Sequence, residues 1–467
     1  MIKPKASLLI PVENQVRELD AKLLLACVAA KRGLTAIIGP KRLIESRAAS
    51  FPRSIYLAKS VLHGHRKFLR LACKLGHKVV AWDEDALVHL PPEIYFSRRL
   101  SAASLACVSH LFAWGEDNAA LWRQYPELPQ DLPIHVTGNP RGDLLRKEMR
   151  GYYQPAVEKL RNTYGDYILI NTNFNHVNAY TPDRNLFQPC DQNGEPPIFG
   201  RAARGMPRAY AEGLRDHKKA TFTHFLELIP ALEKAFPDHS IVVRPHQVED
   251  QDVYHQIATS CQRVHVINKG YVVPWLIASQ VLIHNGCTTS VEAFGLGVPV
   301  VSYRVAVNPT YDEGFYRLPN GLSHSCFSFA ELEETLRQIL RGRSVDNQGK
   351  GRRALFTHYL AAQEGDLACE RMVDVLAREA ADLDRSPRPP LGGRLAGWYK
   401  VTKRRLRQPS ILDDDPGHAS LKYQRRKHPK VMLEDLRSRI ARFQQRLDHD
   451  GTIRAQQIYP QIFRISG

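Results

Sequence analysis

The fold is decided by residues 280–293, which read Gln280-Val281-Leu282-Ile283-His284-Asn285-Gly286-Cys287-Thr288-Thr289-Ser290-Val291-Glu292-Ala293. The stretch begins with a β-branched apolar run that is typical of a buried parallel strand. A polar turn follows, and Thr and Ser then open a helix. In open α/β sheets, ligands bind at the carboxyl ends of the strands. The free N–H groups and the positive dipole end of such a helix suit an anion such as a phosphate.

A second stretch of the same kind lies about forty residues earlier, where Arg244-Pro245-His246 follows the apolar run Ser240-Ile241-Val242-Val243. We expect its imidazole and guanidinium groups beside the helix start, where they complete a phosphate site. The candidate phosphate-binding residues are Arg244, His246, His284, Gly286, Thr288, Thr289, Ser290 and Glu292. Each kind of residue also has a structural alternative. Thr and Ser can cap the helix, Gly can form a tight turn, His can hydrogen-bond to the backbone, and Arg can pair with a structural carboxylate.

Strands and helices alternate along most of the chain, which predicts parallel, doubly wound sheets. The predicted strands are 7–12, 35–39, 54–57, 78–82, 110–114, 134–137, 167–170, 240–243, 264–267, 280–283 and 299–303. The predicted helices are 15–32, 65–75, 101–107, 116–124, 209–235, 289–296, 329–342, 352–380 and 431–447. We expect one Rossmann-like domain over 1–150, a second over 160–383, and a basic helical extension over 384–467. Residues 178–207 are rich in Pro, Asn and Gly and predict a long loop over the cleft between the domains.

Length and charge fit this division. A chain of 467 residues exceeds one ordinary hydrophobic core, so two domains are expected. The net charge is +17, and residues 384–467 hold 19 Lys and Arg against 8 Asp and Glu. The surplus therefore lies mainly in the extension, which includes the run Arg425-Arg426-Lys427 and has few aromatic residues. This distribution argues against a nucleic-acid-binding protein, because such a protein needs a basic stripe with aromatic residues on its folded face.

Other classes of protein are disfavoured by what the sequence lacks. The eight Cys have no C-x-x-C spacing, which predicts reduced thiols in a cytosolic protein, without a zinc site. The sequence contains no run of eighteen apolar residues, so no transmembrane helix is predicted. The apolar part of the N-terminus is too short for a signal peptide.

Further polar residues end predicted strands and are expected to face the cleft. Asp83, Glu84 and Asp85 end the strand at 78–82; a buried carboxylate among like charges has a raised pKa, which suits a general base. The alternative is a set of acids that cap the next helix. Candidates for sugar or acceptor contacts are Glu13, Asn14, Asn171, Asn173 and His176.

Two α/β halves with phosphate-binding loops in the second are typical of the glycosyltransferase B-type (GT-B) fold. Over roughly residues 5–345 the sequence resembles the bacterial surface-carbohydrate biosynthesis proteins. More distantly, it is similar to sialyltransferases and Kdo transferases, which use CMP-activated nonulosonic acids. The resemblance is carried by Trp82-Asp83-Glu84-Asp85, Phe112-Ala113-Trp114-Gly115-Glu116-Asp117, Val136-Thr137-Gly138-Asn139-Pro140-Arg141, Ile170-Asn171-Thr172-Asn173-Phe174 and His284 to Ala293.

The resemblance implies roles for individual residues. His246 and the hydroxyls of Thr288–Ser290 correspond to groups that bind the donor phosphate, and Glu84, followed by Asp83, corresponds to the catalytic acid pair. The sequence departs from the family pattern at Ala86, where those enzymes have Gly, and at Gln247, where they have Pro.

The expected function is thus transfer of a sugar from a CMP-activated nonulosonate, most simply CMP-Kdo, to a glycan or lipid-linked acceptor. The setting would be bacterial capsule, O-antigen or lipopolysaccharide synthesis. Alternatives on the same fold are a UDP-sugar transferase or epimerase, a CDP-polyol phosphotransferase, and a non-catalytic scaffold of the export machinery. No metal or cofactor is expected. The location would be cytoplasmic, with the basic extension on the anionic inner-membrane surface, on an assembly partner, or merely solvated.

Overall fold

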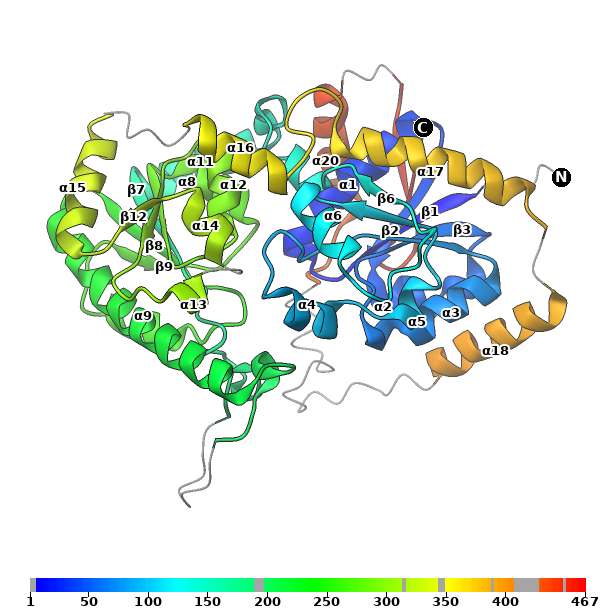
Figure 1. Cartoon of the computed structure of the whole chain (residues 1–467). Helices are drawn as coiled ribbons and strands as arrows, with labels where there is room; N and C mark the ends of the chain where they lie inside the picture. The colour runs from blue at the N-terminus through cyan, green and yellow to red at the C-terminus, as the bar shows by residue number, and fades with distance from the viewer. Residues whose placement is uncertain are drawn as a thin grey trace. The chain divides into compact units, whose positions relative to one another are not determined.

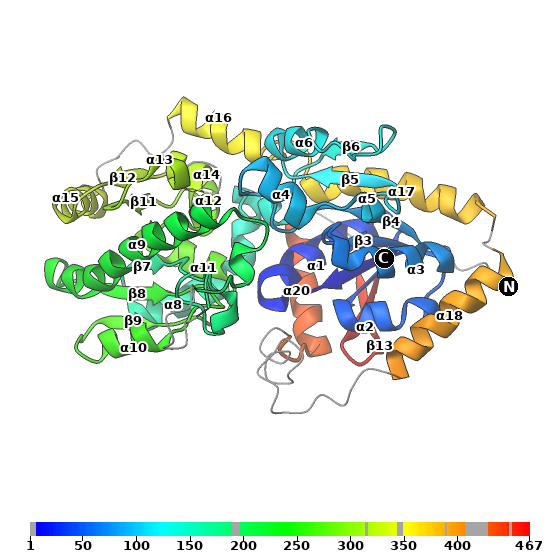
Figure 2. The ribbon, with the colours of Figure 1, turned by 60° about the horizontal axis from the view of Figure 1, so that its bottom comes forward.

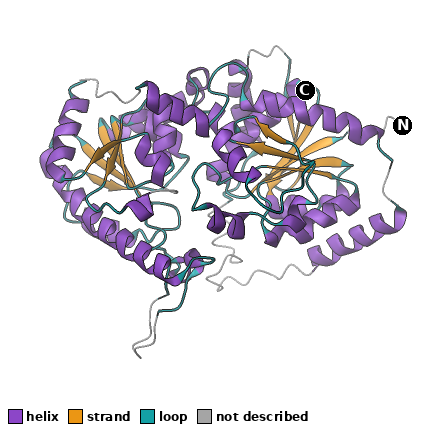
Figure 3. Cartoon of the chain, viewed as in Figure 1, coloured by secondary structure: helices purple, strands orange, loops and turns teal. Residues whose placement is uncertain are grey.

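The computed structural model describes residues 6–188, 197–312, 316–342, 349–387, 390–406, 428–447 and 451–467. The chain divides into two compact units. Unit 1 comprises Met1–Leu87, Arg99–Tyr152 and His358–Gly467, and unit 2 comprises Val88–Arg98 and Tyr153–Thr357. Each unit is an α/β domain whose sheet lies between helices (Figures 1 and 3). The predicted fold class, with two Rossmann-like domains, is confirmed.

The sheet of unit 1 has eight strands in the order β13-β14-β2-β1-β3-β4-β5-β6. The six strands β1 to β6 are parallel, and the hairpin β13–β14 joins β2 in antiparallel fashion. Their bounds are β1 Ser7–Val12, β2 Thr35–Pro40, β3 Ser54–Ala58, β4 Lys78–Ala81, β5 His110–Ala113, β6 Ile134–Val136, β13 Arg454–Tyr459 and β14 Ile462–Ser466.

The helices of unit 1 surround this sheet. Helix α1 is apolar over Leu23–Ala30 and is fully buried there, because α7, α17 and α20 cover it on the side away from the sheet. The bounds are α1 Gln15–Lys31, α2 Lys41–Ser46, α3 Arg66–Leu75, α5 Ala102–Leu105, α6 Glu116–Arg123, α7 Pro140–Asp143, α17 Ala368–Arg385, α18 Leu391–Leu406 and α20 Leu433–Arg446. Figure 2 shows α18 beside α3 and α2, with which it makes contact.

The sheet of unit 2 has six parallel strands in the order β12-β11-β10-β7-β8-β9. The strand bounds are β7 Tyr167–Asn171, β8 Ser240–Arg244, β9 Val264–Val266, β10 Val281–His284, β11 Val300–Tyr303 and β12 His324–Cys326. The helices are α4 Pro92–Arg99, α8 Gln154–Tyr164, α9 Arg208–Ala235, α10 Asp252–Ala258, α11 Val272–Ala278, α12 Thr289–Leu296, α13 Pro309–Asp312, α14 Arg317–Gly321, α15 Phe329–Leu340 and α16 Lys350–Tyr359. The core on one face joins the β-branched residues of the central strands to apolar residues of α9 and α15.

The C-terminal part of the chain differs from the predicted division. The single helix predicted over 352–380 is wrong, since α16 ends at Tyr359 and α17 begins at Ala368. The segment between them contains Ala362 and Gly365 with positive φ, which no helix accommodates. The carboxylate of Asp143 in unit 1 accepts hydrogen bonds from the first amides of α17, so that helix belongs to unit 1.

The basic extension is also part of unit 1. Its predicted helix at 431–447 is confirmed as α20, but the sequence did not predict the hairpin β13–β14. The basic run Arg425–Lys427 lies outside the described residues. In the described ranges, no helix is long and apolar enough to cross a membrane.

The predicted loop at 178–207 packs within unit 2, as far as residues 178–188 and 197–207 are described. Its apolar residues form a small core with Ile94 of α4 and with Ala211 and Leu214 of α9. Residues 189–196, also part of that prediction, lie outside the described ranges.

Candidate nucleotide-phosphate site in unit 2

The strand order of unit 2 places a topological switch point between β7 and β10. From β7 the chain builds the sheet in one direction through β8 and β9, and then returns to β10 and builds in the other. In sheets of this kind the ligand crevice lies at the carboxyl ends of those two strands. Asn171 and His284 end the strands and are paired in register. The motif at 284–293 and the motif at 171–173 therefore meet at one edge, which we call the switch-point edge.

His284 positions the loop after β10. Its Nδ1 accepts a hydrogen bond from the amide of Gly286 (2.9 Å), and its Nε2 lies 2.7 Å from the hydroxyl of Ser323. Because that hydroxyl donates to the carbonyl of Pro319, the imidazole is the donor to Ser323. Burial lowers the pKa of His284 to about 3, so the ring is neutral. The structure therefore gives His284 a role in positioning this loop.

Gly286 is required by its surroundings. Its φ is +85°, and a Cβ built on it would lie 1.9 Å from the Cδ1 atom of Tyr316. Both the left-handed backbone and the close approach of a buried ring exclude a side chain here.

The start of α12 faces the same edge. The Nδ2 group of Asn171 donates to the hydroxyl of Thr289 (2.9 Å), while the Oδ1 atom of Asn171 is buried and has no hydrogen-bond partner in the described part of the chain. The hydroxyl of Ser290, in contrast, donates to the carbonyl of Cys287. Thr288 is half-buried, as is Thr289, and Glu292 is buried. Thr288 and Thr289 are therefore the hydroxyls that a ligand at this edge can reach.

A buried carboxylate that the sequence reasoning missed holds the loops after β7 and β8 together. Glu249 is 1% exposed and accepts hydrogen bonds from the hydroxyls of Thr172 and Tyr254 and from the amides of Phe174 and His246. Burial raises the pKa of Glu249 in spite of these donors. The sequence feature that could have revealed Glu249 is its position three residues after His246.

The loop after β7 is tied to the loop after β10 as well. The amide of Asn173 donates to Oδ1 of Asn285 over 2.8 Å, so Asn173 lies at the predicted edge. His176 is close enough to Lys218, Arg98 and His246 for their charges to lower its pKa, which burial already holds well below its usual value. The Nδ1 atom of His176 has no hydrogen-bond partner among the described residues.

Arg244 does not point to this edge. Its guanidinium donates to the carbonyls of Lys269 and Gly270 (3.0 and 3.1 Å) and stacks 4.6 Å from the ring of Trp275. Burial lowers the pKa of Arg244 to about 10, which leaves it charged at neutral pH. The partners of Arg244 are therefore backbone carbonyls and an aromatic ring, not the structural carboxylate of the predicted alternative, and the guanidinium holds the turn after β9.

The cation at the edge is Lys218, on α9, which the sequence reasoning also missed. Lys218 is 4% exposed, and its ammonium lies 5.0 Å above the ring of Tyr316. Within the described residues it makes no hydrogen bond or ion pair. Burial lowers the pKa of Lys218 to about 8, although the nearby carboxylate of Glu249 acts against that shift. Lys218 lies in the apolar stripe of α9, between Leu214 and Phe225. A lysine in such a stripe is expected to be buried, and this sequence feature could have revealed it.

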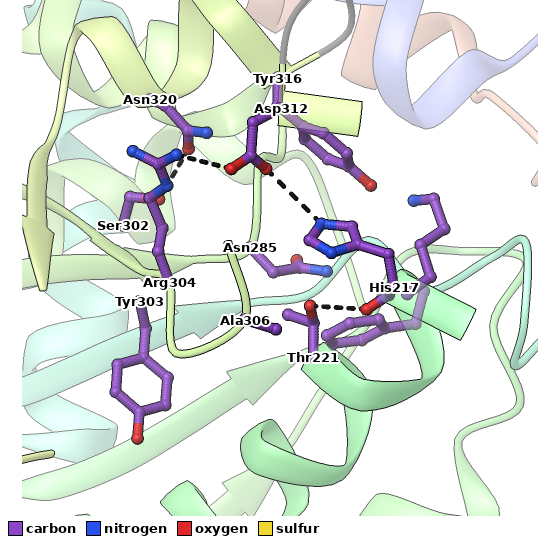
Figure 4. Close-up of a pocket in the computed structure, with 12 residues that line it drawn as sticks. His217, Thr221, Asn285, Ser302, Tyr303, Arg304, Ala306, Asp312, Tyr316 and Asn320 are labelled. Atoms are coloured by element: carbon purple, nitrogen blue, oxygen red, sulfur yellow. Dashed lines mark hydrogen bonds and ion pairs between the residues drawn. The ribbon is translucent and has the colours of Figure 1, made fainter. Parts of the chain in front are cut away.

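Lys218 lines a small cavity together with Asn285 and Tyr316. Figure 4 shows Asn285 and Tyr316 in this cavity. Asp312 forms one wall, where it pairs with Arg304 (2.7 Å) and with the imidazole of His217 (3.5 Å). A larger cavity of about 280 Å³ adjoins His176 and includes Phe187, Arg215 and Lys219 in its lining. Unit 2 thus offers cationic, partly enclosed space beside the switch-point edge.

The predicted acids of unit 1 are engaged in ion pairs. The carboxylate of Glu84, 3% exposed, accepts from the indole N–H of Trp82 (3.0 Å) and lies 3.4 Å from the ammonium of Lys22. Asp83 binds the guanidinium of Arg99 through both oxygens. Glu84 and Asp83 are therefore structural in this arrangement.

Asp85 and Glu13 are more accessible than Glu84. Burial acts to raise the pKa of Asp85, but the guanidiniums of Arg17 and Arg99 hold it far below its usual range. Glu13 and Asn14 follow β1, and the side chain of Glu13 is 32% exposed and pairs with Lys59 (2.5 Å). The strand order of unit 1 puts its own switch point between β1 and β3, so Glu13 lies at the corresponding edge. In the described ranges, no cluster of His, Cys, Asp and Glu suits a metal ion.

Comparisons with known proteins give distant likenesses only. No family model and no curated protein matches the sequence. Among solved structures, UDP-GlcNAc 2-epimerase from Methanocaldococcus jannaschii in complex with UDP-GlcNAc and UDP is 13% identical, with a TM-score of 0.46, over 80% of this chain and 99% of that one. UDP-N-acetylglucosamine 2-epimerase from Rickettsia bellii is 11% identical, with a TM-score of 0.48, over 82% and 99%. The wall teichoic acid polymerase TagF is 9% identical, with a TM-score of 0.46, over 82% and 90%.

Proposed function

We propose that this protein is a nucleotide-sugar-dependent glycosyltransferase that binds the donor phosphate at the switch-point edge of unit 2. The donor we propose is a CMP-activated nonulosonate such as CMP-Kdo, and the acceptor is a glycan of a bacterial surface polysaccharide. The phosphate site is argued from the residues of unit 2. The donor and acceptor classes come from the resemblance in the motifs at 171–174 and 284–293.

The observation that carries the proposal is the ammonium of Lys218. A buried charge without a partner is unfavourable, and proteins keep such a charge where a ligand supplies the partner. Here the charge lies on the helix that faces the loop of Asn285 and Gly286, next to Tyr316. A phosphate at this edge would neutralise Lys218.

The same groups favour departure of the nucleotide. When the glycosidic bond breaks, negative charge grows on the phosphate, and preorganised donors stabilise that charge. Lys218, the hydroxyl of Thr289 and the first N–H groups of α12 supply such donors. His246, held through its amide by Glu249, adds an imidazole.

For the acceptor we propose Glu13 in place of Glu84. Glu84 is enclosed by Lys22 and Trp82, whereas Glu13 is 32% exposed at the edge of unit 1. A carboxylate that takes a proton from an acceptor hydroxyl must come within hydrogen-bond distance of it.

A thermal-shift panel of CMP, CDP and UDP tests the proposal on the wild type, on Lys218→Met and on Lys234→Met. Lys234 is the matched control, since it is an exposed lysine on the same helix and lines neither cavity. We expect CMP to stabilise the wild type and Lys234→Met but not Lys218→Met. Stabilisation by UDP and not by CMP, lost in Lys218→Met, would keep the site and reject the donor; equal shifts in all three proteins would reject the site.

Activity is tested by mass spectrometry of products after incubation with CMP-Kdo and membrane-derived glycans. We expect a glycan product whose mass has increased by one Kdo residue. This product should not form with Lys218→Met or with Glu13→Gln. Nucleotide binding without any product from CMP-linked or UDP-linked donors would point to a non-catalytic scaffold.

A further inference from the structure

Helix α18 carries an apolar face that the described residues leave uncovered. Leu391 is 73% exposed, Leu395 66%, Trp398 56% and Tyr399 60%. These positions are spaced by four, seven and eight residues, which puts all four side chains on one side of the helix. Four large apolar side chains so exposed on one helix face mark a binding surface.

The other side of α18 attaches the helix to unit 1. Val401 is 4% exposed, and a Cβ on Gly397 would lie 2.9 Å from a methyl group of Leu75 on α3. The helix thus packs closely on α3 at Gly397 and Val401, and its large apolar residues stay exposed. The exposed face is not part of the core of unit 1.

The charged residues in the sequence of this helix have one sign. The sequence of α18 contains five basic residues and no acidic one, namely Arg394, Lys400, Lys403, Arg404 and Arg405. The ammonium of Lys403 lies 5.7 Å from the ring of Tyr399. The supporting helix α3 adds exposed Lys67, Arg70 and Lys74, and it also lacks acidic residues.

We propose that α18 is a membrane-docking helix that inserts this apolar face into the surface of an anionic lipid bilayer. Leucine, tryptophan and tyrosine on one side of a lysine- and arginine-rich helix are typical of helices that lie in the membrane interface. Basic side chains then contact the acidic headgroups. This inference goes beyond the proposed function and does not depend on it.

Trp398 provides a direct measurement. The chain has five Trp, and the other four, at 82, 114, 122 and 275, are buried. Quenching of fluorescence by brominated lipid therefore reports mainly on Trp398. With full-length protein and mixed phosphatidylglycerol–phosphatidylcholine vesicles, we expect quenching and a blue shift. Trp398→Phe should abolish both signals, while the protein still co-sediments with the vesicles.

Matched variants distinguish insertion of the apolar face from electrostatic attraction to the vesicle surface. Leu391→Ser combined with Leu395→Ser should lower vesicle partitioning by about tenfold or more, because two exposed leucines no longer become buried on binding. Phe327→Ser, at a position 47% exposed in unit 2, is the control and should bind as the wild type does. Neither variant should change the melting temperature of the free protein.

Three results would overturn the proposal. One is the absence of wild-type binding to anionic vesicles. Another is binding that the double leucine variant retains, or that occurs without quenching, since it would be electrostatic only. The third is a concentration-dependent dimer in light scattering that the double variant dissociates, which would assign the face to a second copy of this chain.

Discussion

Two lysines buried to the same degree differ in what surrounds them. Lys22 in unit 1 is 2% exposed, and its ammonium contacts the carbonyl of Pro11 (2.8 Å), Glu18 (2.7 Å) and Glu84 (3.4 Å). Lys218 in unit 2 is 4% exposed and makes no hydrogen bond or ion pair within the described residues. Burial alone therefore does not identify a functional charge. The first lysine completes a structural network, and the second is the group that we propose to bind a ligand phosphate.

The same contrast extends to the two switch-point edges. At the edge of unit 1, the acids predicted as catalytic are held by Lys22, Arg17 and Arg99. At the edge of unit 2, Lys218 and the buried Oδ1 atom of Asn171 lack partners in the described ranges. We infer that binding chemistry is concentrated in unit 2.

We expect Lys22→Met to destabilise the protein more than any other variant proposed here. Removal of this ammonium leaves Glu18 and Glu84 as buried charges without their cation, which should lower the free energy of unfolding by about 3–5 kcal/mol. Urea denaturation followed by circular dichroism measures this loss. Lys74→Met, on the surface of α3, is the control and should be neutral. A Lys22→Met protein as stable as the wild type would contradict the structural role of the network.

Gly286→Ala should cause the second-largest loss of stability. Left-handed backbone strain and the clash with Tyr316 together should destabilise the protein by about 2–4 kcal/mol. Gly270→Ala separates the two causes, because Gly270 also has positive φ (+73°) but no atom within 4 Å of the added Cβ. Thermal melts of both variants give the comparison. Equal losses would show that the approach of Tyr316 is unimportant.

Lys218→Met should shift stability in the opposite direction from Lys22→Met. Because no partner among the described residues is left behind, removal of the buried ammonium should raise the free energy of unfolding at pH 7 by about 3 kcal/mol, the equivalent of the lowered pKa of Lys218. Lys234→Met, exposed on the same helix, is the control. A loss of stability in Lys218→Met would mean that the lysine has a structural partner.

The pH dependence follows from the same group. The pKa of Lys218 is about 8 in the folded protein and about 10.5 in the unfolded chain. Between these values the unfolded state binds more protons, so this group makes the wild type more stable as pH rises, by about 1.4 kcal/mol per pH unit. Below pH 8 it contributes no slope. Denaturation of the wild type and Lys218→Met at several pH values isolates the difference, which should vanish above pH 10.5.

The smallest expected effect concerns two adjacent hydroxyls. Thr289→Val should weaken CMP binding by about 3- to 10-fold, as expected for loss of one hydrogen bond. Ser290→Ala should leave the affinity unchanged, because that hydroxyl already donates to Cys287. Isothermal titration calorimetry distinguishes them. The reverse order would mean that the wrong face of α12 has been assigned to the ligand.

Much of the fold could be predicted from the sequence. The apolar runs that become β1 to β11 are continuous enough to show parallel strands, and they end at polar motifs. The hairpin β13–β14 could not be predicted in this way, because Arg454–Tyr459 is polar and lies at the sheet edge. The return of α17 to unit 1 depends on long-range bonds to Asp143, which no local pattern reveals.

The site could be predicted only in part. Asn171 and Thr289 were predicted because they follow strands, and they do meet. The direction of Arg244 and the partners of Glu84 depend on side-chain packing that strand ends do not specify. Lys218 lies on a helix far from either motif, and only its place in an apolar stripe distinguishes it from the exposed lysine beside it.

We propose Lys218 as the cation for a bound nucleotide phosphate, and calorimetric titration of CMP into Lys218→Met and Lys234→Met at pH 7 tests this most directly. We expect Lys218→Met to lose affinity by about 10- to 100-fold, as expected for a charged hydrogen bond, while Lys234→Met binds as the wild type does. Equal affinity of the two variants for CMP would contradict it.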